Sequence, residues 1–238
     1  MATFPDGASP GRAERTAVIL CGGDSTRMGS DKALLRMGEH TLLERALSAV
    51  EPHVAQCLLA CGTEPRYQHL GLPLILDTER GGGPLIGLLA GIESAQTPWV
   101  LLVACDMPAL GDGILEDLVA QATSGSATAA EDVDVWLFED DGGLHPLCAL
   151  YRRRNVLPAV RAALAAGERS MVSFWKHPGE NGRALVVRRL RGAGSTQPAG
   201  RAESSGPAVA AGLDPLANLN TREELDSARR ALRLPVEP

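Results

Sequence analysis

Short apolar runs alternate along the first half of the chain with a segment of helical periodicity. The runs carry almost no polar alternation, so each predicted strand needs cover on both faces, as in a sheet that lies between two helix layers. The residues between the first two runs place their apolar positions on one helix face. The apolar runs occupy residues 16–20, 56–62, 72–77 and 99–105, and the helical face carries Leu42, Leu43, Ala46, Leu47 and Val50.

The second half of the chain continues this alternation. Capping boxes predict helix starts at Thr41, with Glu44, and at Thr221, with Glu224. Strands are predicted at 133–138 and 145–151, and helices from Pro84, at 111–120, at 152–166 with an interruption or kink at Pro158, and from Thr221. The pattern predicts an α/β fold: a Rossmann-like, mostly parallel sheet with helices on both faces, in a three-layer sandwich.

Length and local composition define the expected domain organisation. The chain has 238 residues, which suits one domain with a sizeable core. Residues 1–15 are rich in Pro, Gly and Ala and are expected to form a disordered lead-in without a signal or membrane segment. Residues 192–212 consist largely of Gly, Ala, Ser and Pro and predict a flexible insertion. We therefore expect a single domain over 16–238.

Overall charge and cysteine content narrow the function classes. A formal charge of −6 and an aromatic content of 3% disfavour a nucleic-acid surface, since such surfaces need basic charge and stacking platforms. The five cysteines lack metal-ligand spacing, and their odd number is unlike a disulfide framework. No stretch is long and apolar enough for a membrane helix. These features predict a cytoplasmic protein that binds neither nucleic acid nor membrane.

The most informative stretch is the loop after the first predicted strand, which reads LCGGDSTRMGSDK over residues 20–32. Its glycines allow backbone N–H groups to approach an anion closely, and Arg27 and Lys32 add positive charge. This combination predicts a phosphate-binding loop. It is not the P-loop of kinases and ATPases, because no glycine stands directly before Lys32 and no Ser or Thr follows it.

A second informative position is Asp106, which follows the run 99–105 and stands two residues before Pro108. A carboxylate that faces bound phosphates is repelled unless a divalent cation lies between them. Asp106 is therefore predicted to bind Mg²⁺, with a cap on the following turn as the alternative. The phosphate loop has no hydroxyl after Lys32, so a metal ligand from elsewhere in the chain is needed.

The run L-x-G-G-x-S-x-R-M-G-x-D-K resembles the signature loop of the nucleotidyltransferase family that includes the molybdenum cofactor guanylyltransferases. The resemblance continues through G-P-L-x-G at 83–87, D-x-P at 106–108, H-P at 145–146, A-G-E-R at 166–169 and N-x-N at 218–220. It implies Mg²⁺-dependent transfer of GMP from GTP to the phosphate of molybdenum-loaded molybdopterin, which releases pyrophosphate and forms the guanine dinucleotide cofactor. It also implies transient contact with molybdopterin-delivering proteins and molybdoenzyme chaperones.

The resemblance implies roles for individual residues. Arg27, Lys32 and Asp106 would be catalytic, and Asp106 would hold the metal. Nucleotide contacts would come from Leu20, Cys21, Gly22, Gly23, Lys32, Asp77 and Asp106. Acceptor or secondary contacts would come from His145, Arg169, Asn218 and Asn220. Other interpretations stay open at three places: Asp77 as a loop residue or helix cap, His145 as a structural histidine, and the arginines near Arg169 as a solvated helix face.

Related enzymes and an inactive protein are the competing interpretations. A molybdopterin cytidylyltransferase or a sugar-phosphate nucleotidyltransferase would use the same chemistry, but the block 83–87 favours the guanylyl enzyme. Where family members often carry Asn after the second strand, this chain has Ala60-Cys61-Gly62, so a nucleoside contact there is lost or supplied by backbone. An inactive nucleotide-binding regulatory module would not need Arg27, Lys32 and Asp106 together.

Overall fold

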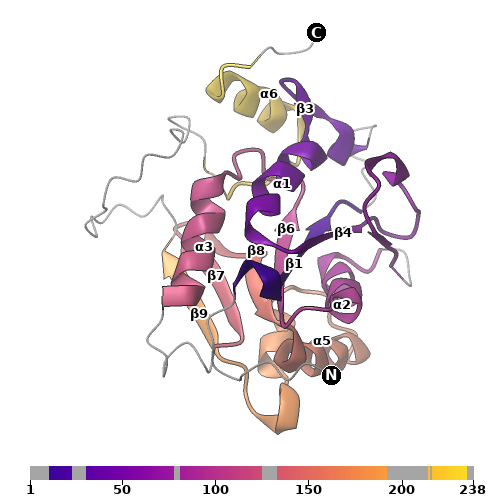
Figure 1. Cartoon of the computed structure of the whole chain (residues 1–238), viewed down its shortest axis with the longest axis vertical. Helices are drawn as coiled ribbons and strands as arrows, with labels where there is room; N and C mark the ends of the chain where they lie inside the picture. Colours follow the sequence, from indigo (N-terminus) through magenta and orange to yellow (C-terminus); the bar gives the residue numbers. More distant parts are fainter. Residues whose placement is uncertain are drawn as a thin grey trace.

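A seven-stranded sheet forms the centre of the computed structural model, which describes residues 11–22, 31–77, 81–124, 133–191, 214 and 216–234 (Figure 1). Its strand order is β5-β4-β1-β6-β8-β7-β9. Neighbouring strands are parallel except that β8 is antiparallel to both β6 and β7. The strands are β1 (Arg15–Leu20), β4 (Gln56–Ala60), β5 (Leu74–Ile75), β6 (Trp99–Ala104), β7 (Val135–Asp140), β8 (Gly143–Arg152) and β9 (Val187–Arg191).

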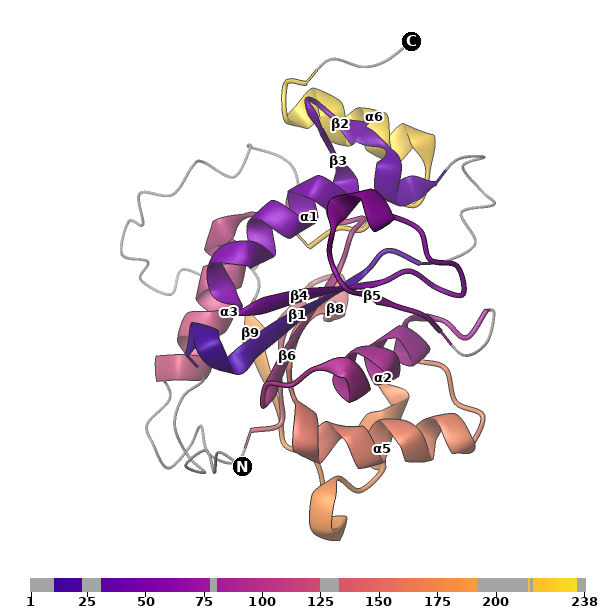
Figure 2. The ribbon, with the colours of Figure 1, turned by 45° about the vertical axis from the view of Figure 1, so that its right-hand side comes forward.

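Helices cover both faces of this sheet (Figure 2). One face packs against α1 (Leu42–Val50) and α3 (Asp112–Ser124), and the other packs against α2 (Pro84–Ser94) and α5 (Arg153–Ala165). The mostly parallel, three-layer α/β fold predicted from the sequence is therefore confirmed. Short 3-10 helices lie in the connections: η1 (Arg12–Glu14), η2 (Lys32–Leu34), η3 (Glu51–His53), η4 (Gln68–Leu70), η5 (Ser173–Lys176) and η6 (Glu180–Gly182).

The two central strands explain why the sequence carries continuous apolar runs. Along β1, Ala17 and Ile19 belong to the core cluster under α1 and α3, whereas Val18 belongs to the cluster under α2 and α5. Along β6, Leu101 and Leu102 divide between the same two clusters. Successive side chains point to opposite faces, and both faces are buried, so all of β6 and residues 17–20 of β1 are apolar.

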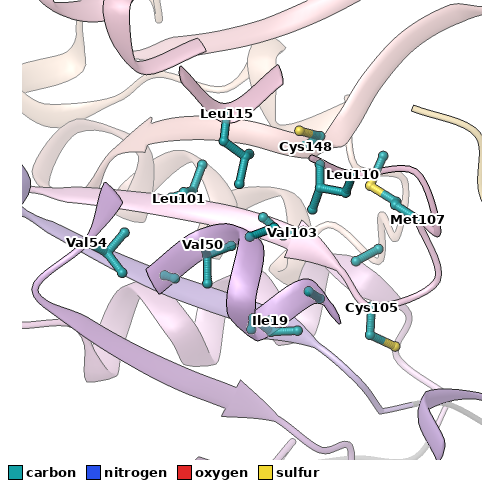
Figure 3. Packing of buried hydrophobic residues seen from close by; sticks show 14 of the residues in the cluster. Ile19, Val50, Val54, Leu101, Val103, Cys105, Met107, Leu110, Leu115 and Cys148 are labelled. Atoms are coloured by element: carbon teal, nitrogen blue, oxygen red, sulfur yellow. The ribbon is translucent and has the colours of Figure 1, made fainter. Parts of the chain in front are cut away.

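The core under α1 and α3 extends to the carboxyl end of β6. Figure 3 shows Ile19 and Val103 of the sheet beside Val50 of α1, with Cys105 and Met107 beyond the end of β6. Both of these sulfur-containing side chains are buried. The chain segment that leaves β6 is therefore fixed by packing on either side of Asp106.

Two glycines let α2 lie close against the sheet. A Cβ atom added at Gly91 would lie 2.7 Å from both methyl groups of Val18, and one added at Gly87 would lie 2.6 Å from a methyl group of Leu20. Any larger residue at either position would therefore push the helix away from the sheet. Pro84 occupies the first turn of α2, where its missing N–H costs no hydrogen bond.

A small third cluster joins the C-terminal helix to the hairpin formed by β2 (Arg36–Met37) and β3 (His40–Thr41). Met37 and Leu42 pack there against Leu225 and Ala228 of α6 (Arg222–Ala231). Capping boxes at Thr41 and Thr221 begin α1 and α6, as predicted. The cluster brings residues 216–221, which precede α6, back to the sheet.

Three details differ from the sequence-based expectations. Residues 11–15, expected within the lead-in, form η1 and the first residue of β1, since Arg15 is buried and its Nε donates to His53 O at 2.6 Å. Helix α5 runs through Pro158 without interruption. Strand β9 was not predicted, because its three arginines hide the alternation. Residues 1–10 and the predicted insertion 192–212 lie outside the described residues.

The described helices contain none with both the length and the apolar character needed to cross a membrane. All five cysteines carry free thiols, and four of them are buried, with Cys57 only partly covered. The four buried cysteines are packed within the hydrophobic core.

Candidate active site

The carboxyl ends of β1 and β6 lie side by side, and the candidate site begins there. Leu20 pairs with Ala104 across the two parallel strands, and the next residue, Cys105, donates its N–H to Leu20 O at 3.1 Å. Asp106 follows directly. Its carbonyl oxygen accepts a hydrogen bond from Leu219 N at 2.8 Å, which fastens the segment before α6 to the end of β6. Three stretches far apart in the sequence therefore meet at one edge of the sheet.

Lys32 and Asp106 form an ion pair at this edge. Lys32 Nζ lies 2.6 Å from Asp106 Oδ2, and the two side chains are 18% and 19% exposed. The same ammonium lies 3.4 Å from Asn220 Oδ1. Because Lys32 is the first residue of η2, the position of its backbone is set by the N-cap residue Asp31, whose Oδ1 accepts from Ala33 N at 3.1 Å.

Three buried oxygens at the carboxyl edge of the sheet have no hydrogen-bond partner among the described residues. They are Asp77 Oδ1, Asp106 Oδ1 and Asn218 Oδ1. A buried acceptor without a partner is costly, so such atoms mark a place where a ligand supplies the missing contact. Burial also raises the pKa of the Asp77 carboxyl. The edge therefore presents acceptors suited to a cation or to N–H and O–H donors.

The chain passes from β1 into the glycine loop by lying directly against the end of β4. Cys21 N and Gly22 N both donate to Ala60 O, at 3.0 and 2.8 Å. A Cβ atom at Gly22 would lie 2.2 Å from Gly62 N, so this position admits only glycine without a backbone shift. The next predicted site residues, Gly23 and Arg27, lie outside the described residues.

The oxygen atoms around Asp106 suit a magnesium ion. Mg²⁺ prefers oxygen ligands and is usually bound through one or two carboxylates together with water and substrate phosphates. Asp106 Oδ1 and Asn218 Oδ1 both lack a hydrogen-bond partner in the described part of the chain, and both are oxygen ligands of the kind that Mg²⁺ prefers. Within the described ranges, no group of three or more His, Cys, Asp or Glu side chains could form an all-protein metal cage. The donor set fits an ion that shares its coordination with a substrate.

Comparison with known proteins assigns the family. The MobA-like NTP transferase domain matches residues 17–181. The chain belongs to this family. It is 35% identical to the molybdenum cofactor guanylyltransferase of Serratia proteamaculans, in a match that covers 68% of this chain and 79% of that protein. A probable molybdenum cofactor guanylyltransferase of Nostoc sp. is 34% identical, with 68% and 77% coverage. The family resemblance derived from the sequence is confirmed.

Solved structures of the same fold include one protein whose name refers to a guanine dinucleotide and one that is named a cytidylyltransferase. Molybdopterin-guanine dinucleotide biosynthesis protein A from Archaeoglobus fulgidus has a TM-score of 0.65 at 20% identity, with 92% of this chain and 98% of that chain covered. The 2-C-methyl-D-erythritol 4-phosphate cytidylyltransferase from Thermus thermophilus has a TM-score of 0.56 at 18% identity, with 91% and 98% coverage. These likenesses support the nucleotidyltransferase fold predicted from the sequence. As a MobA-like family member, the protein is a nucleotidyltransferase.

The remaining predicted residues of this MobA-like enzyme are held by local partners. His145, at the start of β8, lies 2.7 Å from Asp140 Oδ2 across the β7–β8 turn. Arg169 donates to the carbonyl oxygens of Leu164 and Glu168, at the end of α5. Neither side chain has a described hydrogen bond to Lys32 or Asp106, so the acceptor roles of His145 and Arg169 stay predictions.

Sequence reasoning missed three residues that hold the start of η2. Asp31, Arg66 and Tyr67 form a hydrogen-bonded group next to Lys32. Asp31 is the aspartate of the signature motif, directly before its lysine, but the sequence analysis gave it no role. No sequence signal marked Arg66 and Tyr67, since they lie in the irregular connection between β4 and β5, and only the fold brings them to Asp31.

Proposed function

We propose that this MobA-like nucleotidyltransferase transfers GMP from GTP to the phosphate of molybdenum-loaded molybdopterin. Pyrophosphate leaves, and the product is the molybdopterin guanine dinucleotide. The observation that carries the proposal is the Lys32–Asp106 pair, with Nζ 2.6 Å from Oδ2 and the second carboxylate oxygen unpartnered among the described residues, beside the start of a glycine loop. The names of the curated relatives supply the guanine nucleotide and the molybdenum cofactor.

Lys32 and Arg27 are assigned to the triphosphate. The Lys32 ammonium is held by Asp106 and Asn220, so it is directed at the edge where phosphates would lie. A fixed positive charge stabilises the negative charge that develops on the leaving pyrophosphate. Arg27 belongs to the same loop and is given the same role on the basis of the family motif.

Asp106 is assigned to Mg²⁺, with Asn218 as a second oxygen contact. When bound there, the ion would neutralise phosphate charge and polarise the phosphorus that is attacked. The two oxygens of the Asp106 carboxylate have different tasks in this proposal. Oδ2 binds the Lys32 ammonium, and Oδ1 would bind the metal. Leu219 N donates a hydrogen bond to the backbone oxygen of Asp106, which keeps the Asn218–Asn220 segment next to Asp106.

No protein nucleophile is required. The acceptor phosphate attacks the α-phosphorus directly, and the enzyme contributes alignment and charge neutralisation. We assign the nucleoside to the backbone of Leu20, Cys21, Gly22 and Gly23 and to Asp77, whose buried Oδ1 is ready to accept a hydrogen bond. His145, Arg169, Asn218 and Asn220 are assigned to the acceptor side. The enzyme is proposed to act in the cytoplasm, with transient contacts to molybdopterin-delivering proteins and molybdoenzyme chaperones.

Nucleotide choice is the decisive experiment. The purified protein is incubated with Mg²⁺ and GTP, CTP, ATP or UTP. The acceptor is molybdenum-loaded molybdopterin, a sugar phosphate or neither, and pyrophosphate and the nucleotidylated product are measured. We expect product with GTP only. Asp106→Asn should lower its rate of formation on the order of 10³-fold. Asp117→Asn, which removes an exposed carboxylate from α3, should leave that rate unchanged.

Each other outcome identifies a competing function. Product with CTP would mean a molybdopterin cytidylyltransferase, and product only with a sugar phosphate as acceptor would mean a sugar-phosphate nucleotidyltransferase. Either result would reject the assignment as a guanylyltransferase, whereas the roles proposed for Lys32 and Asp106 in nucleotidyl transfer would still hold. Nucleotide binding without turnover in any mixture would mean a regulatory module.

A further inference from the structure

The connection between β4 and β5 contains a residue in an unfavourable backbone conformation. Tyr67 has φ +67°, in the left-handed region that bulky side chains rarely adopt. Glycines with positive φ flank it, Gly62 at +73° and Gly71 at +66°. A strained non-glycine residue persists only when its surroundings hold it, and such residues concentrate at functional sites.

The phenol of Tyr67 connects the two ends of the glycine loop. Its oxygen lies 2.7 and 2.8 Å from the two carboxylate oxygens of Asp31 and 3.0 Å from Cys21 O. Cys21 precedes the undescribed stretch 23–30, and Asp31 follows it. Only 5% of Tyr67 is exposed, and burial and the neighbouring Asp31 raise the pKa of its phenol. The phenol therefore stays protonated at neutral pH, and its single O–H is shared, in a bifurcated hydrogen bond, between this carboxylate and Cys21 O.

Asp31 is held from several directions at once. Its carboxylate accepts from Ala33 N at 3.1 Å and from Arg66 Nη1 at 3.2 Å, in addition to the Tyr67 phenol. Arg66 also donates to Cys61 O at 3.2 Å, and its guanidinium lies 5.7 Å from the centre of the Tyr67 ring. The carboxylate has no freedom to move without breaking charge-assisted hydrogen bonds.

This fixed carboxylate sets the direction of the catalytic lysine. Asp31 is the N-cap of η2, and Lys32 is the first residue of that turn, with its Nζ 2.6 Å from Asp106 Oδ2. A shift of Asp31 would move the Lys32 backbone directly. Loss of the phenol would in addition release Cys21 O, at the point where the chain leaves β1.

We propose that Tyr67 is a positioning residue for nucleotidyl transfer, which clamps the two ends of the phosphate-binding loop through Asp31 and Cys21 and so orients Lys32. This inference rests on one part of the proposed function, namely that the loop binds the nucleotide. The strained backbone of the β4–β5 connection is explained by the clamp, because the left-handed turn directs the phenol at both loop ends.

The test uses Tyr67→Phe, which keeps the buried ring and removes only the phenolic oxygen. Thr16→Val is the matched control, since it removes a buried hydroxyl contact of 2.7 Å to Thr97 Oγ1 at the opposite end of β1. We expect Tyr67→Phe to lower kcat/KM for GTP about tenfold, the effect of one lost hydrogen bond to a charged group. The KM for the acceptor should change less than about twofold, because its proposed contacts lie on other segments.

A double-variant cycle with Asp31→Asn tests whether Tyr67 acts through Asp31. Two groups that act as one unit give non-additive effects. We expect the double variant to be no slower than Asp31→Asn alone. The proposal would be overturned if the losses in the two single variants multiplied in the double variant. It would also be overturned if Tyr67→Phe had wild-type kinetics and only a lower Tm. A tenfold loss in the control variant Thr16→Val would overturn it as well.

Amide hydrogen exchange at Ala33 and Leu34 separates this proposal from the proposed function. We expect faster exchange in Tyr67→Phe than in Thr16→Val, measured without any nucleotide. Unchanged exchange would overturn the clamp. If the wild-type protein binds GTP·Mg²⁺ in calorimetry but makes no guanylylated product, only the proposed function is rejected. The clamp can then still be tested, because a displaced loop would lower the GTP affinity of Tyr67→Phe. A wild-type protein that binds no nucleoside triphosphate would overturn both.

Discussion

Two aspartates at opposite edges of the sheet, Asp134 and Asp106, differ in how far the protein itself satisfies their carboxylates. Asp134, just before β7, is 0% exposed, and its carboxylate accepts from Asn155 Nδ2 and Arg183 Nη2 at 2.6 Å and from Val186 N at 2.9 Å. Asp106, just after β6, binds Lys32 through one oxygen and has no described partner for the other. The amino edge satisfies its buried charge internally, whereas the carboxyl edge reserves hydrogen-bonding capacity for a ligand.

The difference follows from the direction of the strands. In open parallel sheets, ligands bind outside the carboxyl ends of the strands, so polar atoms there are needed by the substrate. The amino edge has no such demand. A carboxylate buried there is stable only if its own protein supplies every contact, because a buried unpaired charge is very costly. Removing Asp106 should therefore affect chemistry, and removing Asp134 should affect stability.

The largest expected effect is on catalysis at the carboxyl edge. Asp106→Asn should lower kcat on the order of 10³-fold, because it removes the proposed metal ligand and the charged partner of Lys32. Its free energy of unfolding should change by less than about 1 kcal/mol, since the ion pair is partly exposed to solvent. Steady-state kinetics and urea denaturation measure the two quantities. A stability loss that accounts for the inactivity would contradict the comparison.

The reverse pattern is expected at the amino edge. Asp134→Ala should lower the free energy of unfolding by about 3 kcal/mol, since it leaves Asn155, Arg183 and Val186 N without their common acceptor. The activity of the molecules that remain folded should equal that of the wild type. Urea denaturation and kinetics below the transition check both statements. A specific loss of kcat in the folded protein would show that the two edges are not separate in function.

The next effect concerns the backbone contact between the glycine loop and β4. Gly22→Ala should lower kcat/KM for GTP on the order of 10²-fold, because the added Cβ would lie 2.2 Å from Gly62 N and displace the loop. Gly113→Ala is the matched control, since a Cβ there meets nothing within 4 Å. The control should keep wild-type kinetics and gain roughly 0.5–1 kcal/mol of stability as a helix residue. If Gly22→Ala and Gly113→Ala had the same kcat/KM for GTP, the close contact between Gly22 and Gly62 would not matter for catalysis.

The smallest expected effect is a pH-dependent gain in stability from Asp77→Asn. Burial raises the pKa of the Asp77 carboxyl, so the folded protein retains this proton to a higher pH than the unfolded chain does. Between the two pKa values stability falls as the pH rises, and the cost persists at neutral pH. Asp77→Asn should therefore raise the Tm at neutral pH, and the difference should vanish near about pH 3.5, below the ordinary pKa of aspartate. GTP affinity should fall in the same variant. A lower Tm at neutral pH would contradict this account.

The sequence by itself determined the strands of the central sheet other than β9, most helices and the chemistry-bearing motifs. Strongly apolar runs such as 99–105 and capping boxes such as Thr41 with Glu44 are local signals, so they survive in any context. The same local character made Lys32 and Asp106 visible as candidates. Residue type and position at a strand end carry that information without knowledge of the fold.

Only the tertiary structure decided which of these residues meet. The 2.6 Å contact between Lys32 and Asp106, and the return of Asn218 and Asn220 to them, depend on strand order and on the packing of α6 against β2–β3. Strand β9, with its arginines, and Tyr67, in its left-handed turn, gave no periodic signal because their conformations are fixed by neighbours distant in sequence. Local patterns specify elements, whereas long-range packing decides which side chains face one another.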